Sequence, residues 1–328
     1  MPKIDSIFHY LKKLNKQIKE LHKQTGIHRI YLFFDYLWAY FRHGCLLKQY
    51  FVGEFYRKKE FERRQMLTYR RVWKIIDKYN DPESIHLLEN KVDFNNYFSD
   101  FIHRKWVYSK EMTYSSFIDT AKSSNSIIVK PIDEWEGHGI KKISTVTLSD
   151  DELRDLYDNL KQENVLVEEC IVQDERMEFQ NESVNTIRIY SFYNPVNSKY
   201  VMLKPLLRVG VGNAIIDNYC SGGCVYELDP VEGIIISRSL SKVNPNVLCH
   251  PGTDICMLGY QIPYWKDVVE ICEKAHRHIP QCQIIGWDIA ITDKGQIEFI
   301  EGNHNPDYEL LEFIGETGHY KKIEGCLR

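Results

Sequence analysis

Two carboxylates and a carboxamide near the end of the chain have the types and spacing of a metal site. Asp288 lies in one short apolar run, and Glu301 and Asn303 close the next one. Carboxylate and amide oxygens are ligands that Mg²⁺ accepts, usually together with phosphate oxygens. Two carboxylates held together without a cation repel each other. The set therefore favours a metal platform, whereas either acid alone would suit a solvated surface hairpin.

The turn that must bring these groups together is residues 292–295, where Gly295 can supply a positive φ. If the hairpin closes between Thr292 and Gly295, Asp288 lies opposite Phe299 and shares a sheet face with Glu301 and Asn303. The flanking strands are marked by Ile289, Ile291, Ile297 and Ile300.

The order of Asp288, Glu301 and Asn303 resembles the metal signature of ATP-grasp enzymes. In that family, an acid on one strand and a Glu-x-Asn at the end of the next hold the magnesium ions of ATP. Residues 127–131, followed by 136–140, resemble the strand, lysine and glycine-rich loop that cover the phosphates. Residues 165–171 resemble the hinge strand that receives adenine.

A narrower resemblance covers roughly the last two thirds of the chain. This part of the chain resembles the sugar-transfer-associated ATP-grasp group, whose members tend to be associated with surface-polysaccharide biosynthesis. The matching segments are Asn185-Thr186-Ile187-Arg188, Arg208-Val209-Gly210, Asp217-Asn218 with Ser221-Gly222-Gly223, His250-Pro251, Ile262-Pro263-Tyr264-Trp265 and Gly286-Trp287-Asp288.

The resemblance implies roles for individual residues, with ATP and Mg²⁺ as cofactors. Lys130 and Arg188 would hold the phosphates and act in catalysis, and Asp288, Glu301 and Asn303 would bind the metal. The implied nucleotide-binding residues are Lys130, Gly137, His138, Gly139, Glu168, Glu169 and Ile171, with Glu175 or Glu178 for the ribose. The implied acceptor side is Arg208, Asp217, Asn218, Gly222 and Gly223.

Strand alternation adds detail to two of these assignments. Arg188 lies between Ile187 and Ile189, so it leaves its strand on the polar face, where it could stabilise a transferring phosphoryl group or form a cross-strand ion pair. Glu168 and Glu169 point to opposite faces of the hinge strand, so one of them faces the nucleotide pocket.

Composition limits the class of protein. The 328 residues are 43% apolar and carry a net charge of −4, and no segment approaches the roughly 20 apolar residues of a membrane span. The nine cysteines form no C-x-x-C pair, and an odd count without a signal peptide fits thiols in a reducing cytosol. We therefore expect a cytoplasmic protein.

Charge is concentrated near the start of the chain. Residues 1–80 contain 18 Lys and Arg against 7 Asp and Glu, and residues 4–21 place apolar side chains at helical spacing with lysines beside them. This region would contact an anionic partner, such as a membrane surface or a lipid-linked phosphate, or pack on the core with a solvated basic face. Without a recognised binding motif, and with a slightly acidic chain, nucleic acid is not an expected partner.

These observations predict an α+β protein with an ATP-grasp fold and an N-terminal helical extension. The extension would span residues 1–80 and the catalytic domain residues 81–328, with the hinge near 165–171. The expected activity is a carboxylate–amine ligase acting through an acylphosphate on a small molecule or glycan precursor. The alternatives are a phosphotransferase on a sugar or polyol hydroxyl, and a nucleotide-binding scaffold without turnover.

Overall fold

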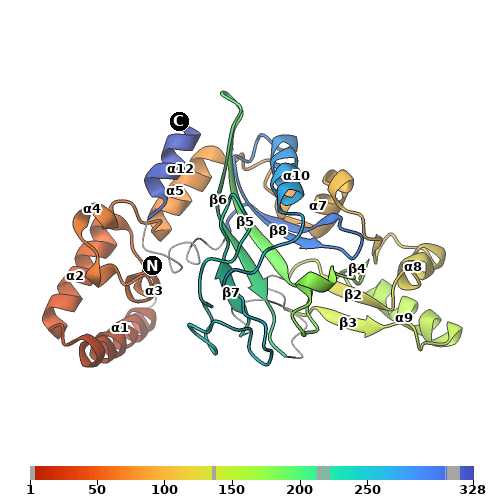
Figure 1. Cartoon of the computed structure of the whole chain (residues 1–328), viewed down its shortest axis with the longest axis horizontal. Coiled ribbons are helices and arrows are strands. Elements are labelled where there is room, and N and C mark those ends of the chain that lie inside the picture. Colours follow the sequence, from red (N-terminus) through yellow and green to blue (C-terminus); the bar gives the residue numbers. More distant parts are fainter. Residues whose placement is uncertain are drawn as a thin grey trace. The chain divides into compact units, whose positions relative to one another are not determined.

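The computed structural model describes residues 4–134, 138–212, 217, 219, 222–306, 308 and 318–328 (Figure 1). The chain forms two compact units. One contains residues 1–78 together with 307–328, and the other contains residues 79–306. The C-terminal segment thus groups with the N-terminal helices, whereas the sequence-based division had assigned it to the catalytic domain.

The first unit is helical. Its first helix, α1 (Ile4–Thr25), forms where apolar spacing predicts it and stops at Gly26, whose φ is +74°. Leu14, Ile18 and Leu21 from the predicted apolar stripe are buried in the core of this unit, and Leu11 is exposed. The other helices are α2 (Arg29–His43), α3 (Leu47–Val52), η1 (Phe55–Arg57), α4 (Glu60–Arg63), α5 (Tyr69–Tyr79) and α12 (Tyr320–Leu327).

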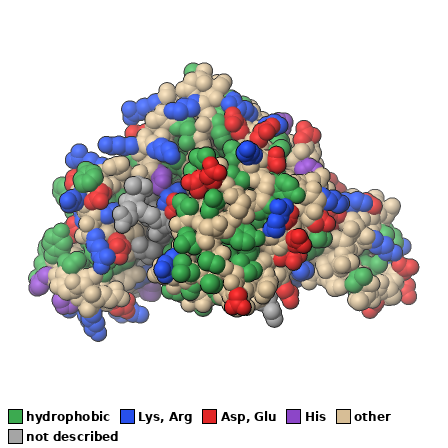
Figure 2. Space-filling view, in the orientation of Figure 1, with side chains coloured by type: hydrophobic (Ala, Val, Ile, Leu, Met, Phe, Trp, Pro, Cys, Tyr) green, Lys and Arg blue, Asp and Glu red, His purple; other side chains and the backbone are tan. Residues whose placement is uncertain are grey.

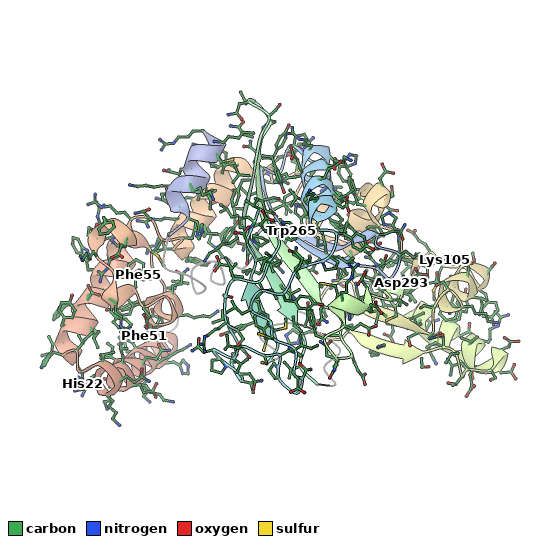
Figure 3. The ribbon with its side chains drawn as sticks, in the orientation of Figure 1. His22, Phe51, Phe55, Lys105, Trp265 and Asp293 are labelled. Atoms are coloured by element: carbon green, nitrogen blue, oxygen red, sulfur yellow. The ribbon has the colours of Figure 1, made fainter. Side chains whose placement is uncertain are left out.

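A buried ion pair anchors the second helix of this unit. Asp35 of α2 binds Arg63 of α4 with an Oδ1–Nη1 distance of 2.8 Å, and the Tyr50 hydroxyl donates to Asp35 Oδ2 at 2.7 Å. Phe51 lies in α3 and Phe55 lies in η1, and both residues are labelled in Figure 3. Within the described ranges, no helix is both long and apolar enough to cross a membrane.

The second unit contains two antiparallel sheets. The smaller sheet has the order β1-β4-β2-β3, from β1 (Trp106–Tyr108), β2 (Ser126–Pro131), β3 (Lys141–Ser144) and β4 (Val165–Glu169). Helices α8 (Tyr114–Ala121) and α9 (Asp150–Gln162) share its core with Ile127, Val129 and Val167. Ser149 and Glu152 form a capping box at the start of α9, with each side chain bonded to the backbone N–H of the other.

The larger sheet has the order β7-β6-β5-β8-β9. Strands β5 and β6 pair on either side of residues 195–198. The large core of this unit lies between the sheet and helices α7 and α10 (Figure 1). The strands are β5 (Thr186–Asn194), β6 (Lys199–Val209), β7 (Cys224–Glu227), β8 (Ile284–Ile291) and β9 (Ile297–Asn303), and the other elements are α6 (His86–Glu89), α7 (Lys91–Tyr97), η2 (Ser99–Phe101), η3 (Glu175–Met177) and α10 (Trp265–His278).

The predicted register of the β8–β9 hairpin is wrong. The predicted turn itself is present, because the Gly295 N–H donates to the Thr292 carbonyl at 2.9 Å and Gly295 has the predicted positive φ of +73°. The strands, however, pair one residue later than expected, since the Thr292 N–H donates to the Gln296 carbonyl at 3.0 Å. Ile289 consequently faces Phe299, and a bulge then shifts the pairing so that Asp288 lies opposite Glu301. The turn and the bulge together move Asp288 from Phe299 to a position directly across from the second carboxylate.

Candidate functional site

The three predicted metal ligands meet at the end of the β8–β9 hairpin. Asp288 and Glu301 are cross-strand partners, and Asn303 lies two residues beyond Glu301 on the same face. The Asn303 Nδ2 atom donates to Glu301 Oε1 at 3.0 Å. Burial and the adjacent Asp288 carboxylate raise the pKa of Glu301 above its ordinary value. Two carboxylates are thus held close enough to disfavour the charge on one of them.

Two arginines from neighbouring strands bind Asp288. Arg188 of β5 contacts both carboxylate oxygens, with an Nη2–Oδ2 distance of 2.7 Å, and Arg208 Nη1 of β6 lies 3.0 Å from Oδ2. Burial alone would raise the pKa of Asp288, but the two guanidinium groups outweigh it and hold the pKa well below its ordinary value. Arg188 therefore forms the cross-strand ion pair that sequence reasoning gave as the alternative to a phosphate contact.

Arg208 also connects this cluster to a third acid. Its Nη2 atom lies 3.1 Å from Asp217 Oδ1, and Asp217 Oδ2 accepts the backbone N–H of Thr186 at 2.9 Å. Burial raises the pKa of Asp217 despite Arg208 and Thr186. The structure thus joins two residues of the expected acceptor side, Arg208 and Asp217, to the expected metal ligand Asp288.

The donor set at the hairpin end fits a magnesium ion. No group of three or more His, Cys, Asp or Glu side chains suited to a metal occurs in the part of the chain that the structure describes. Mg²⁺ does not need one, because it commonly uses one or two carboxylates and completes its shell with phosphate and water. The raised pKa of Glu301 is the sign of carboxylate crowding that a dication would relieve. Glu301 and the amide oxygen of Asn303 would hold the ion, with Asp288 beside them.

Lys130 lies in the smaller sheet and is held by a buried acid. Its Nζ atom is 2.5 Å from Glu168 Oε2, and Glu168 Oε1 accepts from Arg104 Nη2 at 2.7 Å. Arg104 in turn reaches Glu298 of β9 with an Nη1–Oε1 distance of 2.5 Å. Burial raises the pKa of Glu168, but Arg104 and Lys130 overcome it and bring the pKa to about 2. Glu168 is thus ionised at neutral pH and binds the Lys130 ammonium group.

A second lysine, which sequence reasoning missed, lies in the same region. Lys91 at the start of α7 donates from Nζ to the carbonyl oxygens of Ile132 at 3.1 Å and Glu134 at 2.9 Å. Burial lowers the pKa of Lys91, Lys130 lowers it further, and the charge of Glu301 opposes both effects. Lys91 therefore interacts electrostatically both with Lys130 of the smaller sheet and with Glu301 of the larger sheet. A lysine in the first turn of a helix is ordinarily a surface residue, so its sequence position carried no signal.

The sequence matches the sugar-transfer associated ATP-grasp family over residues 70–325. The chain belongs to this family. Membership brings the ATP-grasp fold, and the two antiparallel α+β lobes of the second unit agree with it. The predicted family and fold class are thus confirmed.

Comparison with curated proteins gives no significant match. Among solved structures, an ADP complex of N5-carboxyaminoimidazole ribonucleotide synthetase is similar at a TM-score of 0.46 and 8% identity, covering 73% of this chain and 51% of that one. D-alanyl-alanine synthetase A from Vibrio cholerae gives 0.43 and 14%, with coverages of 75% and 62%. ATP-grasp ligase PsnB, complexed with a minimal precursor variant, Mg and ADP, gives 0.45 and 12%, with coverages of 76% and 60%. The chain thus spans roughly half to three fifths of the length of these structures.

The segment expected to be the hinge, residues 165–171, contains strand β4 and is followed by the chain that leads to the larger sheet. Lys105 and Asp293, labelled in Figure 3, bind the backbone at the end of this segment. The Glu169 N–H donates to the Lys105 carbonyl, and the Asp293 N–H donates to the Val172 carbonyl, each at 2.9 Å. Between these points, the Cys170 N–H donates to the Ser126 carbonyl at 2.9 Å. The backbone at Ile171 thus lies between two hydrogen-bonded segments.

The remaining expected residues lie in exposed turns and loops or outside the described part of the chain. Glu175 and Glu178 are both exposed around η3, so the structure does not choose between them. Of the phosphate loop, His138 and Gly139 form an exposed turn, and Gly137 lies outside the described residues. Gly139 has a φ of +73°, and a Cβ atom there would come within 2.9 Å of Pro131 Cγ. On the acceptor side, Gly222 and Gly223 lie in a loop, and Asn218 is not among the described residues.

Proposed function

We propose that this ATP-grasp protein is an ATP- and Mg²⁺-dependent carboxylate–amine ligase that forms an acylphosphate. The observation that carries the proposal is Lys91, whose pKa responds both to Lys130 of the smaller sheet and to Glu301 of the β8–β9 hairpin in the larger sheet. Such a site offers cations for phosphate oxygens next to oxygen ligands for a metal. It supports phosphoryl transfer from a nucleotide bound between the two sheets.

The arginine cluster supports a carboxylate as the group that receives the phosphoryl. Asp288 holds Arg188 and Arg208 side by side next to Glu301, and Asp217 binds Arg208 from its other side. A planar guanidinium group suits both a substrate carboxylate and a phosphoryl group in transfer. Magnesium, when bound, would neutralise phosphate charge.

The reaction proceeds in two balanced steps. A carboxylate oxygen of the acid attacks the γ-phosphorus of ATP, the bond from that phosphorus to the bridging oxygen breaks, and ADP leaves. An amine then attacks the acyl carbon, phosphate departs with the former carboxylate oxygen, and the amine loses a proton. Lys91 and Lys130 would hold the phosphates, and Arg188 would stabilise charge on the transferring group. An amino acid and a sugar or glycan precursor are the candidate substrates.

Isotope transfer tests this reaction. The protein is incubated with ATP, Mg²⁺ and pools of amines and of acids labelled with ¹⁸O in the carboxylate, and phosphate and products are analysed by mass spectrometry. We expect one ¹⁸O atom in each phosphate released and a product with the mass of an amide. A phosphoester without released phosphate would instead identify a phosphotransferase acting on a hydroxyl. Failure to consume ATP with every pool would favour a nucleotide-binding scaffold.

Lys91→Met is expected to weaken ATP binding about 10- to 100-fold, because it removes a charge-assisted contact worth about 1.5–3 kcal/mol. Adenosine binding should not change, since adenosine has no phosphates for Lys91 to contact. Calorimetric titration of both ligands measures the difference. Lys122→Met, which removes an exposed lysine paired with Asp150, is the matched control. Equal weakening of adenosine and ATP would show that Lys91 supports the loop at Ile132 rather than the phosphates.

A further inference from the structure

Helix α2 carries an apolar face that no other described part of the helical unit covers. Ile30, Phe34, Trp38 and Phe41 recur once per turn and are 62%, 63%, 57% and 72% exposed, and Tyr31 lies beside them. Leu32, Tyr36 and Ala39, on the opposite face, are buried in the core of the helical unit. Hydrophobic side chains are visible on the surface of this unit around α2, next to basic ones (Figure 2). A row of large exposed aromatic side chains indicates a binding surface.

The charge around this face is positive. Asp35 is the one acid in the α2 sequence, and it is neutralised by Arg63 with little exposure. Arg29 and Arg42 lie at the two ends of the helix. The neighbouring helix α1 adds exposed lysines, namely Lys12, Lys13, Lys16, Lys19 and Lys23. An apolar face with basic residues beside it, on a helix whose one acid is paired, suits an anionic and apolar partner.

We propose that the exposed face of α2 docks on the surface of an anionic lipid bilayer. Trp and Tyr side chains favour the boundary between headgroups and acyl chains, and flanking Lys and Arg attract anionic headgroups. A second copy of this chain is a poorer occupant, because two such cationic surfaces repel each other. The predicted membrane contact through the apolar stripe of α1 is thereby moved to α2, since Leu14, Ile18 and Leu21 of that stripe are buried in the unit's own core.

Sedimentation of the full chain with vesicles tests the docking surface. We expect binding to phosphatidylserine-containing vesicles at low salt, release at high salt, and little binding to pure phosphatidylcholine. The double variant Phe34→Ser/Trp38→Ser should bind about tenfold less, because it removes two apolar side chains from the contact. Val196→Ser/Val231→Ser, which removes two side chains that are 93% and 76% exposed in the other unit, should bind as the wild type does.

Three outcomes would overturn the proposal. The first is that the wild type fails to bind anionic vesicles at low salt. The second is that the α2 double variant binds as well as the wild type. Alternatively, light scattering would find a dimer that Phe34→Ser/Trp38→Ser converts to a monomer, which would assign the face to a second copy. Because both substituted side chains are mostly exposed, the double variant should keep its fold, and circular dichroism checks this.

A separate pair of cysteines has the geometry for a cross-link. Cys249 and Cys256 lie opposite each other in an antiparallel bridge. The His250 N–H donates to the Ile255 carbonyl and the Met257 N–H to the Leu248 carbonyl, each at 2.9 Å. Hydrogen bonds on both sides make the cysteines a non-hydrogen-bonded pair, in which Cα atoms are about 4.5 Å apart. This separation lies within the range that a disulfide spans.

The geometry assigns Cys249 and Cys256 as a site of reversible disulfide formation. Both side chains are exposed, while His250 and Met257 next to them are buried. A disulfide oxidant such as oxidised glutathione supplies the reaction. The thiolate of one cysteine attacks the glutathione disulfide and releases one glutathione thiolate. The second cysteine thiolate then displaces the other, so two electrons pass from the cysteine pair to glutathione. The product would close the loop that begins at His250.

Mass spectrometry of the full chain tests this cross-link. After treatment with oxidised glutathione, we expect the native protein to lose two hydrogens in mass and to have these two thiols protected from alkylation. Cys256→Ser should instead carry one glutathione on Cys249, because no second thiol can displace it. Cys170→Ser, at a partly buried cysteine elsewhere, should still form the cross-link. Glutathione on both Cys249 and Cys256 of the native protein, or alkylation of both, would contradict the assignment.

Discussion

Glu301→Gln is expected to abolish the strengthening of ATP binding by Mg²⁺ and to lower turnover about 10³-fold while the fold stays intact. Turnover falls because the substitution removes a ligand charge that neutralises phosphate. The fold survives because Asp288 already disfavours the charge on Glu301, so the neutral amide resembles the state that burial favours. ATP titrations with and without Mg²⁺ measure the first effect without knowledge of the substrates.

Two further variants make this test specific. Asp293→Asn changes an exposed acid in the turn of the same hairpin and should leave Mg²⁺-dependent binding unaltered. Asp288→Asn should reduce both turnover and thermal stability, because it leaves Arg188 and Arg208 buried without their shared carboxylate. If Glu301→Gln retained Mg²⁺-dependent ATP binding, the metal site would have to lie elsewhere.

The sequence predicted which polar side chains meet at the end of the β8–β9 hairpin more securely than it predicted the register of the two strands. The identities of Asp288, Glu301 and Asn303 and the turn at Gly295 follow from local patterns, and the structure brings the three side chains together. The bulge before Ile289 depends on packing along both sides of β8, so the local sequence does not determine it. A prediction from turn position alone therefore misplaced the partner of Asp288.

The ion pairs between residues far apart in the sequence could not be predicted from local sequence patterns. Arg188 and Arg208 were assigned separately, yet the order of strands β6, β5 and β8 brings both to Asp288. Lys91 lies far from the motifs in sequence and reaches the site only because α7 packs near the loop after β2. The same limit explains the N-terminal helices, where periodicity gave the buried face of α1 but could not show that an aromatic face of α2 is left exposed.

Arg104→Met is expected to cause the largest loss of stability in the second unit. Arg104 is buried between Glu168 and Glu298, and its loss leaves Glu298 without a guanidinium partner, in contact with His103, and leaves Glu168 with Lys130 as its cationic partner. Breaking a buried pair in this way costs about 3–5 kcal/mol, which corresponds to a fall in Tm of roughly 6–20 °C for a unit of this size. Lys105 follows Arg104 in the sequence and forms an exposed ion pair with Asp119. The control variant Lys105→Met removes this pair and should change Tm little.

The pH dependence of this loss follows from Glu168. Its pKa falls from an ordinary 4.5 to about 2 in the folded protein, so its ionisation stabilises the fold above about pH 4.5, and this contribution is lost as the pH falls toward 2. Without Arg104, the folded pKa of Glu168 should rise, because burial then acts against the single charge of Lys130. Arg104→Met should therefore differ most from the wild type near neutral pH, and the difference in Tm should shrink as the pH is lowered below 4.5. A constant difference across that range would mean that Arg104 stabilises the unit by packing rather than by holding Glu168 ionised.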